Sequence, residues 1–168
     1  RRAILPRTKR DPRLVAALLY EDLCTFEFGL AAEVFGLKRP EMGADWYKFL
    51  TCAESLAPIR AGGGVAVIAE ADLSGLDRAG TIVIPGWCSE NSAPSQPVAQ
   101  SLRRAHFEGA RLVTICSGAF LLAELGLLDG RSATTHWRYT DRLHQRFPAV
   151  NVQPEVLYVD GDDILTSA

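Results

Sequence analysis

The sequence predicts an α/β protein with a mostly parallel β-sheet flanked by helices on both faces. Short apolar runs typical of buried strands alternate with segments whose apolar residues recur at helical spacing, and neither an internal repeat nor a linker interrupts this order. Of the 168 residues, 48% are hydrophobic, which is enough for one sizeable core. We therefore expect one domain over residues 14–168, preceded by a basic, mobile tail over residues 1–13.

The first half of the chain contains the patterns of three strands and one helix. Residues 14–19 form a continuous apolar run, as in a strand buried on both faces of a sheet. A helical pattern follows over residues 27–37, and residues 46–53 and 65–69 have strand composition. We expect the last two segments to be joined through the glycines at 62–64. These glycines are not a phosphate loop, because no Lys-Ser/Thr pair follows and the next segment is a strand.

The second half continues the alternation of strands and helices. A strand over residues 81–84 leads into Pro85, Gly86 and Trp87, and a strand over residues 111–115 leads directly into an apolar helix. The remaining expected elements are a helix from Ser95 to Gly109, a helix with Tyr139, Leu143 and Phe147 on one face, and a closing hairpin of residues 156–159 and 164–166.

Cys116 is the most informative residue, because it lies where a strand runs into a helix without a loop. A residue in such a turn projects its side chain above the sheet, and the amino end of the helix favours the thiolate over the thiol. The N–H of Ser117 can then face a developing oxyanion. The N–H of Gly86 or Trp87, at the end of the adjacent strand, is a second candidate donor. The alternative is a buried, inert cysteine at a strand end.

Composition narrows the class of protein further. The four cysteines lie far apart and do not cluster with the histidines, so we expect no metal, no cofactor and reduced thiols in the cytoplasm; two disulfides are a less favoured alternative. No apolar run approaches the roughly 20 residues that cross a membrane, and we expect no export signal. The first thirteen residues hold six Lys or Arg and one Asp, so the rest is acidic and a poor binder of DNA phosphates. A nucleic-acid-binding arm is the less favoured interpretation of this tail.

Three motifs in order resemble one known family. Residues 114–137, TICSGAFLLAELGLLDGRSATTHW, closely resemble the signature of the ThiJ/PfpI (class I glutamine amidotransferase-like) domains found at the amino end of AraC-type transcription activators, the GlxA and FtrA group. Residues 24–37 and 157–168 agree with the FtrA branch of that group. The resemblance spans residues 14–168 and implies a flavodoxin-like fold with a cysteine elbow between strand and helix.

The resemblance also implies site residues. Cys116 matches the elbow cysteine of the family, His136 the histidine that follows it, and Glu27 the acidic residue that approaches the sulfur in many relatives. An imidazole can shuttle a proton for the thiol, and a carboxylic acid can donate a hydrogen bond to the thiolate or take a proton. The candidate pocket-lining residues are Thr135, Trp87 and Trp137. The two tryptophans suit a pocket for an amide or amine ligand, and packing in the core is an equally good interpretation of such large aromatic residues.

Each of these acid–base residues also has a plainer interpretation. His136 is equally suited to capping the start of the next helix, and Glu27 without the resemblance is an ordinary first-turn acid favoured by the helix dipole. His106 and His144 lie on helical patterns, and we expect both at the surface.

Departures from the family pattern favour a sensor over an enzyme. Thr114 stands where the amidotransferases have glycine, Ser117 stands where the peptidase-like members have histidine, and no His-x-Glu pair follows. We therefore expect a ligand-sensing, dimerising domain that responds to a small nitrogen-containing metabolite. It would act on DNA through an AraC-type helix-turn-helix module, which we expect beyond residue 168 after a further helix. The alternative is a cysteine-dependent amidase or hydratase-type enzyme, and a third hypothesis is a vestigial site in a domain that serves only to dimerise.

Overall fold

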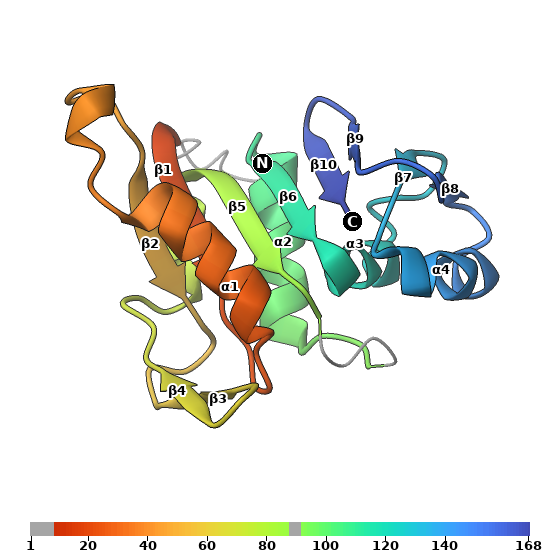
Figure 1. Ribbon diagram of the computed structural model, residues 1–168, viewed down its shortest axis with the longest axis horizontal. Helices are drawn as coiled ribbons and strands as arrows, with labels where there is room; N and C mark the ends of the chain where they lie inside the picture. Colours follow the sequence, from red (N-terminus) through yellow and green to blue (C-terminus); the bar gives the residue numbers. More distant parts are fainter. Residues whose placement is uncertain (1–8, 88–91) are drawn as a thin grey trace, which may run out of the picture.

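The computed structural model describes residues 9–87 and 92–168, which form a six-stranded sheet between layers of helices (Figure 1). In order across the sheet the strands are β2 (Lys48–Cys52), β1 (Asp11–Leu18), β5 (Ala79–Pro85), β6 (Arg111–Ile115), β10 (Ile164–Ser167) and β9 (Tyr158–Asp160). β9 is antiparallel to β10, as the predicted hairpin requires, and the other four neighbouring pairs are parallel. The order confirms the predicted, mostly parallel α/β fold.

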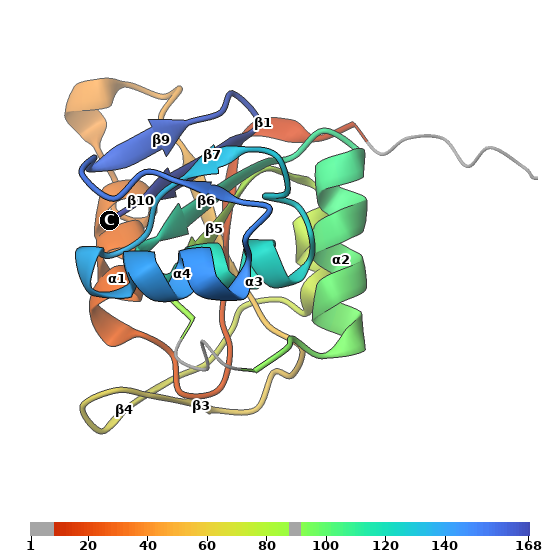
Figure 2. The same ribbon diagram turned by 90° about the vertical axis from the view of Figure 1, so that its right-hand side faces the viewer.

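Side chains alternate along the central strands, so each strand supplies both faces of the sheet. The helices are α1 (Thr25–Ala31), α2 (Gln96–Phe107), α3 (Ala119–Glu124) and α4 (Thr140–Arg146). Leu18 and Ile84 belong to the large core that includes the buried sides of α2 and α3. Val15 and Val83 pack instead with Ala31 of α1. Figure 2 shows α1 and α2 on opposite sides of the sheet.

The first strand begins earlier than expected, at Asp11 rather than at residue 14. The side chain of the preceding Arg10 is largely buried: its guanidinium donates to the carbonyls of Leu76 and Ala79 at 2.8 and 2.9 Å and pairs with Glu108 at 3.0 Å. The predicted mobile tail is therefore wrong over residues 10–13, because this basic side chain finds partners inside the fold. Residues 1–8 of that tail lie outside the described part of the chain.

The glycines at 62–64 join a hairpin that the sequence did not suggest. They connect β3 (Ile59–Ala61) to β4 (Val65–Val67), whereas we expected them to connect residues 46–53 to 65–69. Gly63 and Gly64 both have φ of +79°, a conformation that glycine adopts without strain. A second short pair, the parallel strands β7 (Ser132–Ala133) and β8 (Asn151–Val152), was also not predicted.

The helices lie where the sequence predicts them, and short π- and 3₁₀-helical segments continue or adjoin several of them. Ser95 caps α2, with its Oγ accepting from the N–H of Val98 at 3.3 Å, and Gly109 follows the helix with φ of +96°. The predicted helix at 27–37 is α1 continued by a π-helical segment. The π and 3₁₀ segments are η1 (Ala32–Gly36), η2 (Pro40–Met42), η3 (Leu73–Asp77), η4 (Cys116–Gly118) and η5 (Trp137–Tyr139). Among the described residues, no helix is both long enough and apolar enough to cross a membrane.

One histidine departs from its expected surface position. His106 of α2 is largely buried, with its Nε2 2.7 Å from Oδ2 of Asp163, and Arg131 binds the same carboxylate at 2.7 and 3.1 Å. The expectation is wrong for His106 because the start of β10 brings an acidic partner over the helix. His144 is exposed, as expected.

Candidate functional site at the cysteine elbow

Cys116 lies at a strand-to-helix elbow. β6 ends at Ile115, Cys116 has a positive φ of 56°, and the 3₁₀ segment that follows leads into α3. A non-glycine residue in this region of φ costs about 1–3 kcal/mol, which the surrounding contacts must offset. Gly118 allows the turn to pack closely, because a Cβ there would lie 2.6 Å from the carbonyl oxygen of Ile84. The junction predicted for Cys116 is confirmed.

The thiol of Cys116 is partly buried and hydrogen-bonds with the carboxyl of Glu27. Burial, followed by Glu27, raises the pKa of Cys116 to about 11, whereas the N–H of Ser117 acts in the opposite direction. We expected the helix amino end to favour the thiolate. That expectation is wrong because α3 has only six residues, and its weak dipole does not outweigh desolvation and a neighbouring carboxylate.

The start of α1 brings Glu27 to the elbow, and with it Cys24, which the sequence analysis did not identify as a site residue. Cys24 precedes α1 at its N-cap position, and its Sγ would lie 2.6 Å from a Cβ on Gly86. It is also close enough to Cys116 to contribute to the raised pKa of that thiol. The sequence offered one signal for this, since Cys24 lies three residues before Glu27, one helical turn away.

His136 does not contact the thiol in this structure. Its Nδ1 accepts from the N–H of Arg138 at 3.2 Å, and its ring packs on Trp137 and Tyr139 with centroids 5.4 and 5.6 Å apart. Of the two interpretations of His136, the structure therefore agrees with the one in which it caps the start of the next helix. The neighbouring Thr135 does reach the elbow, because its hydroxyl donates to the carbonyl of Cys116 at 2.7 Å.

The expected second oxyanion donor is not in place. The N–H of Gly86 lies 3.1 Å from the carbonyls of both Ile84 and Ile115, and the N–H of Trp87 donates to Oγ of Ser117 at 2.9 Å. Both amides at the end of β5 are thus used within the fold. Ser117 remains the backbone donor, since its N–H faces the sulfur of Cys116.

The three candidate pocket residues lie in different environments and do not line one pocket. Trp87 is buried and lines a cavity of about 380 Å³ beside the end of β5. Trp137 lies at the surface with 68% of its area exposed, where Arg138 stacks over it at 5.7 Å. Thr135 is fully buried, so it supports the elbow carbonyl and does not line an open cavity.

The donors around the elbow do not form a metal site. Within residues 9–87 and 92–168, no three His, Cys, Asp or Glu side chains come together in a way that could hold an ion. Cys24, Cys52 and Cys116 are all thiols, whereas Cys88 lies outside the described residues.

Comparisons with known proteins agree with this geometry. The model of the DJ-1/PfpI family matches residues 15–168. The chain is 32% identical over 139 residues to a protein of the cpoL 5′ region of Streptomyces lividans, covering 82% of this chain and 97% of that one. It is 32% identical over 125 residues to the HTH-type transcriptional regulator CdhR of Pseudomonas aeruginosa, covering 74% of this chain. It is 27% identical over 153 residues to the HTH-type transcriptional regulator GlxA of Rhizobium meliloti, covering 90% of this chain.

The matches cover only 37% of CdhR and 47% of GlxA, so the chain spans less than half of these regulators. Among solved structures, an AraC family transcriptional regulator from Pseudomonas putida superimposes with a TM-score of 0.77 at 21% identity, over 94% of this chain and 84% of that one. Drosophila melanogaster DJ-1beta superimposes with a TM-score of 0.77 at 20% identity, over 92% and 81%. These likenesses show the same fold. With a matching family model, an elbow cysteine and relatives among helix-turn-helix regulators, the chain belongs to the DJ-1/PfpI family.

Proposed function

We propose that residues 14–168 form the ligand-sensing and dimerising domain of an AraC-type regulator that responds to a small, nitrogen-containing metabolite. CdhR and GlxA are HTH-type regulators, and the part that matches this chain is the smaller part of each. The resemblance to amidotransferase-like domains supports a nitrogen-containing ligand. The acidic balance of residues 14–168 supports a DNA-binding module outside them.

The observation that carries the proposal is the position of the Cys116 thiol, which is partly buried and hydrogen-bonds with the carboxyl of Glu27. Burial and the neighbouring Glu27 raise the pKa of Cys116 to about 11, so the thiol form dominates at neutral pH. His136, the candidate base, is engaged at its own helix start. A protonated thiol that hydrogen-bonds with Glu27 is poorly suited to attacking a ligand, which favours a sensor over a cysteine-dependent enzyme.

The alternative is a cysteine-dependent enzyme of the amidase or hydratase type. Two observations favour it: the strained elbow at Cys116 and the N–H of Ser117 at the sulfur, which is a donor that an oxyanion needs. In addition, 63 residues are 36% identical to the isonitrile hydratase of Pseudomonas putida, a match to 37% of this chain and 28% of that enzyme.

A Cys116→Ser variant separates the two functions. We expect a thermal-shift screen of nitrogen-containing metabolites to find a ligand that binds the wild type and the variant with similar affinity. We also expect iodoacetamide to modify Cys116 no faster than Cys24 or Cys52 at neutral pH. Turnover of such a metabolite by the wild type, lost in the variant, would overturn the sensor in favour of the enzyme.

Dimerisation is supported by an apolar row on the outer side of α1 and of η1, the π-helical segment that continues it. Phe26, Leu30 and Val34, spaced four residues apart, expose 78%, 44% and 37% of their area. Residues at this spacing share one face of a helix. Such a row is suited to pairing with the same row of a second copy across a two-fold axis.

A further inference from the structure

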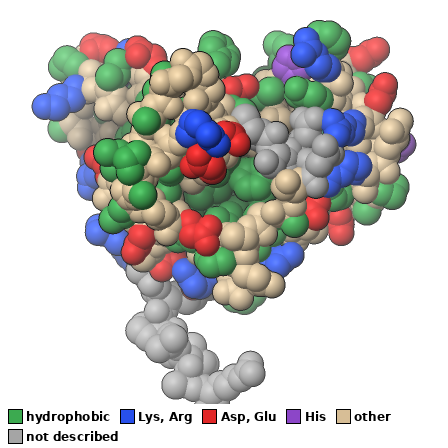
Figure 3. Space-filling view, turned by 90° about the horizontal axis from the view of Figure 1, so that it is seen from below, with side chains coloured by type: hydrophobic (Ala, Val, Ile, Leu, Met, Phe, Trp, Pro, Cys, Tyr) green, Lys and Arg blue, Asp and Glu red, His purple; other side chains and the backbone are tan. Residues whose placement is uncertain are grey.

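A cavity of about 380 Å³ opens near the carboxyl ends of β1, β2 and β5, within the size range of small-molecule sites. Cys116 is not among its lining residues, so this cavity is distinct from the elbow. Figure 3 shows this face of the molecule hollowed over an apolar floor, with acidic side chains beside the hollow. Parallel sheets bind ligands beyond the carboxyl ends of their strands, which is where this cavity lies.

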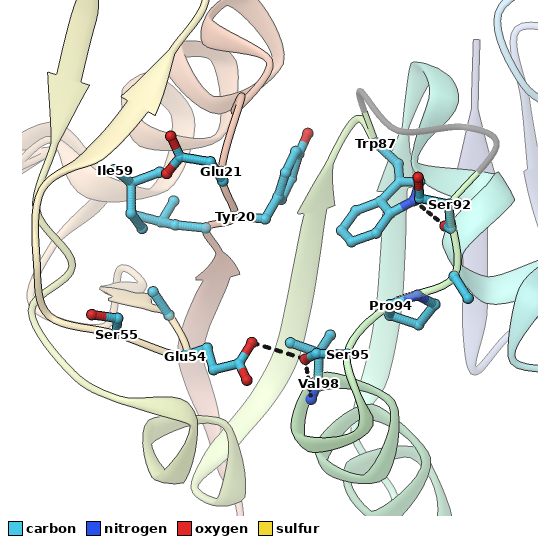
Figure 4. Close-up of a pocket in the computed structure, with 13 residues that line it drawn as sticks. Tyr20, Glu21, Glu54, Ser55, Ile59, Trp87, Ser92, Pro94, Ser95 and Val98 are labelled. Carbon is cyan, nitrogen blue, oxygen red and sulfur yellow. Dashed lines mark hydrogen bonds between the residues drawn. The ribbon is translucent and has the colours of Figure 1, made fainter.

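Two aromatic rings form one side of the cavity. Tyr20 and Trp87 approach each other with ring centroids 4.9 Å apart (Figure 4). The hydroxyl of Tyr20 donates to the carbonyl of Pro85 at 2.7 Å, and the indole N–H of Trp87 donates to the carbonyl of Ser92 at 3.1 Å. Because these polar atoms are bonded within the protein, the rings offer the cavity their carbon and π surfaces. Leu19, nearly fully buried, extends the apolar wall.

The charged groups of the cavity are acidic. Its described lining residues include Glu21 and Glu54, and none of them is Lys, Arg or His. Arg60, close by, is engaged by Glu21 at 3.5 Å and Asp22 at 3.1 Å. The carboxylate of Glu54 accepts from the hydroxyl of Ser95 at 2.8 Å, a neutral partner that leaves its charge uncompensated.

The nearby start of α2 does not turn the cavity into an anion site. Pro97 in the first turn has no N–H, and the N–H of Val98 is already bonded to Oγ of Ser95. The start of α2 therefore has few free N–H groups that could bind an anion. The charged group beside it is Glu54 (Figure 4). A ligand anion would meet two carboxylates and few N–H groups.

We infer that this cavity binds an alkylammonium cation, with its alkyl groups against Tyr20 and Trp87 and its charge facing Glu54. Cations are attracted to the faces of Trp and Tyr, most strongly where water is excluded, and a carboxylate adds a second attraction. The inference rests on the proposed sensing function and names the class of its ligand. Trp87 also connects the cavity to the elbow, because its N–H is bonded to Ser117.

Isothermal titration calorimetry with choline, and with its uncharged carbon isostere dimethylbutanol, tests this assignment. We expect saturable binding of choline and none of dimethylbutanol at the same concentrations. Glu54→Gln preserves the shape and the acceptor for Ser95 but removes the charge, and we expect it to weaken choline binding by about tenfold. Glu41→Gln, at an exposed position on η2 that does not line the cavity, is the matched control and is expected to bind as the wild type does.

Three results would overturn the assignment: no saturable choline binding by the folded wild type, equal binding of the two probes, or unchanged binding by Glu54→Gln. Cys116→Ser is expected to bind choline as the wild type does, and a loss of choline binding in that variant would place the cation at the elbow and count against the cavity. None of these results bears on the broader sensing function. That function fails separately, if the domain turns over its ligand through Cys116.

Discussion

Cys116 illustrates how one position can have the backbone of a nucleophile and the electrostatics of a resting thiol. The elbow holds Cys116 at a φ of 56° with the N–H of Ser117 at its sulfur. Partial burial and the carboxyl of Glu27 nevertheless raise the pKa of the thiol to about 11. Reactivity therefore depends on the neighbours of Cys116 as much as on its place in the turn.

The Glu27→Gln variant tests this balance. Removing the negative charge is expected to move the pKa of Cys116 from about 11 toward the ordinary value of 9.0, while burial keeps it above that value. The rate of iodoacetamide modification against pH measures the midpoint. Because the raised pKa suppresses the thiolate, the variant should react faster than the wild type below the wild-type midpoint.

Glu33→Gln, on the helical segment that continues α1, is the control and should leave the midpoint unchanged. An identical midpoint in Glu27→Gln and the wild type would mean that burial alone sets the pKa of Cys116.

The longer secondary-structure elements could be predicted from sequence, whereas several of the shortest could not. β6 has the predicted bounds of residues 111–115, and α2 begins after Ser95, because apolar patterning and an N-cap serine leave clear signals. β3, β7 and β8 have only two or three residues each. Segments of this length are too short to show the alternation of apolar and polar residues that marks a strand. Tertiary contacts therefore determine whether they form strands.

The candidate site was predictable to a similar degree. The resemblance brought Glu27 and Cys116 together, and the structure places them in contact. It did not reveal that the N–H groups of Gly86 and Trp87 are already bonded, or that His136 caps its own helix start. The direction of a side chain and the hydrogen-bond partner of a backbone N–H depend on loop geometry. The spacing of residues in the sequence does not predict that geometry.

A network at the other end of the sheet joins three segments through Asp163. Arg131, and to a smaller extent His106, lower the pKa of Asp163 from 3.8 to about 2. Since the folded pKa is lower than the unfolded one, the stabilisation is complete above pH 3.8 and disappears as the pH falls through about 2. Asp163→Asn is expected to lower the free energy of unfolding at neutral pH by about 1 kcal/mol, a value reduced for solvent screening because the side chain is half exposed.

Urea denaturation at neutral pH and near pH 2 measures this difference, which should shrink at the lower pH. Asp162→Asn alters a neighbouring exposed carboxylate and is expected to be close to neutral. A difference between Asp163→Asn and the wild type that persists at both pH values would show that the network stabilises by packing and not by charge.

Both candidate sites lie at the carboxyl ends of the parallel strands. The elbow lies at the end of β6 and the aromatic cavity near the ends of β1 and β5. The hydrogen bond from the N–H of Trp87 to Ser117, 2.9 Å long, joins them directly. A ligand that shifts Trp87 would thus act on the turn that carries Cys116, and the proposed sensing function would use this short physical path between cavity and elbow.

The outer side of α1 and of η1, which continues it, is a candidate surface for dimerisation. In a two-fold dimer built on Phe26, Leu30 and Val34, the same row of each copy meets its counterpart, so one substitution places two charges in one apolar interface. Leu30→Glu is expected to raise the dissociation constant of the dimer by at least about tenfold. Light scattering at two protein concentrations, with Leu157→Glu as a control at an exposed leucine before β9, measures the change. A wild type that stays monomeric at both concentrations, or a Leu30→Glu variant as dimeric as the wild type, would remove α1 as the pairing surface.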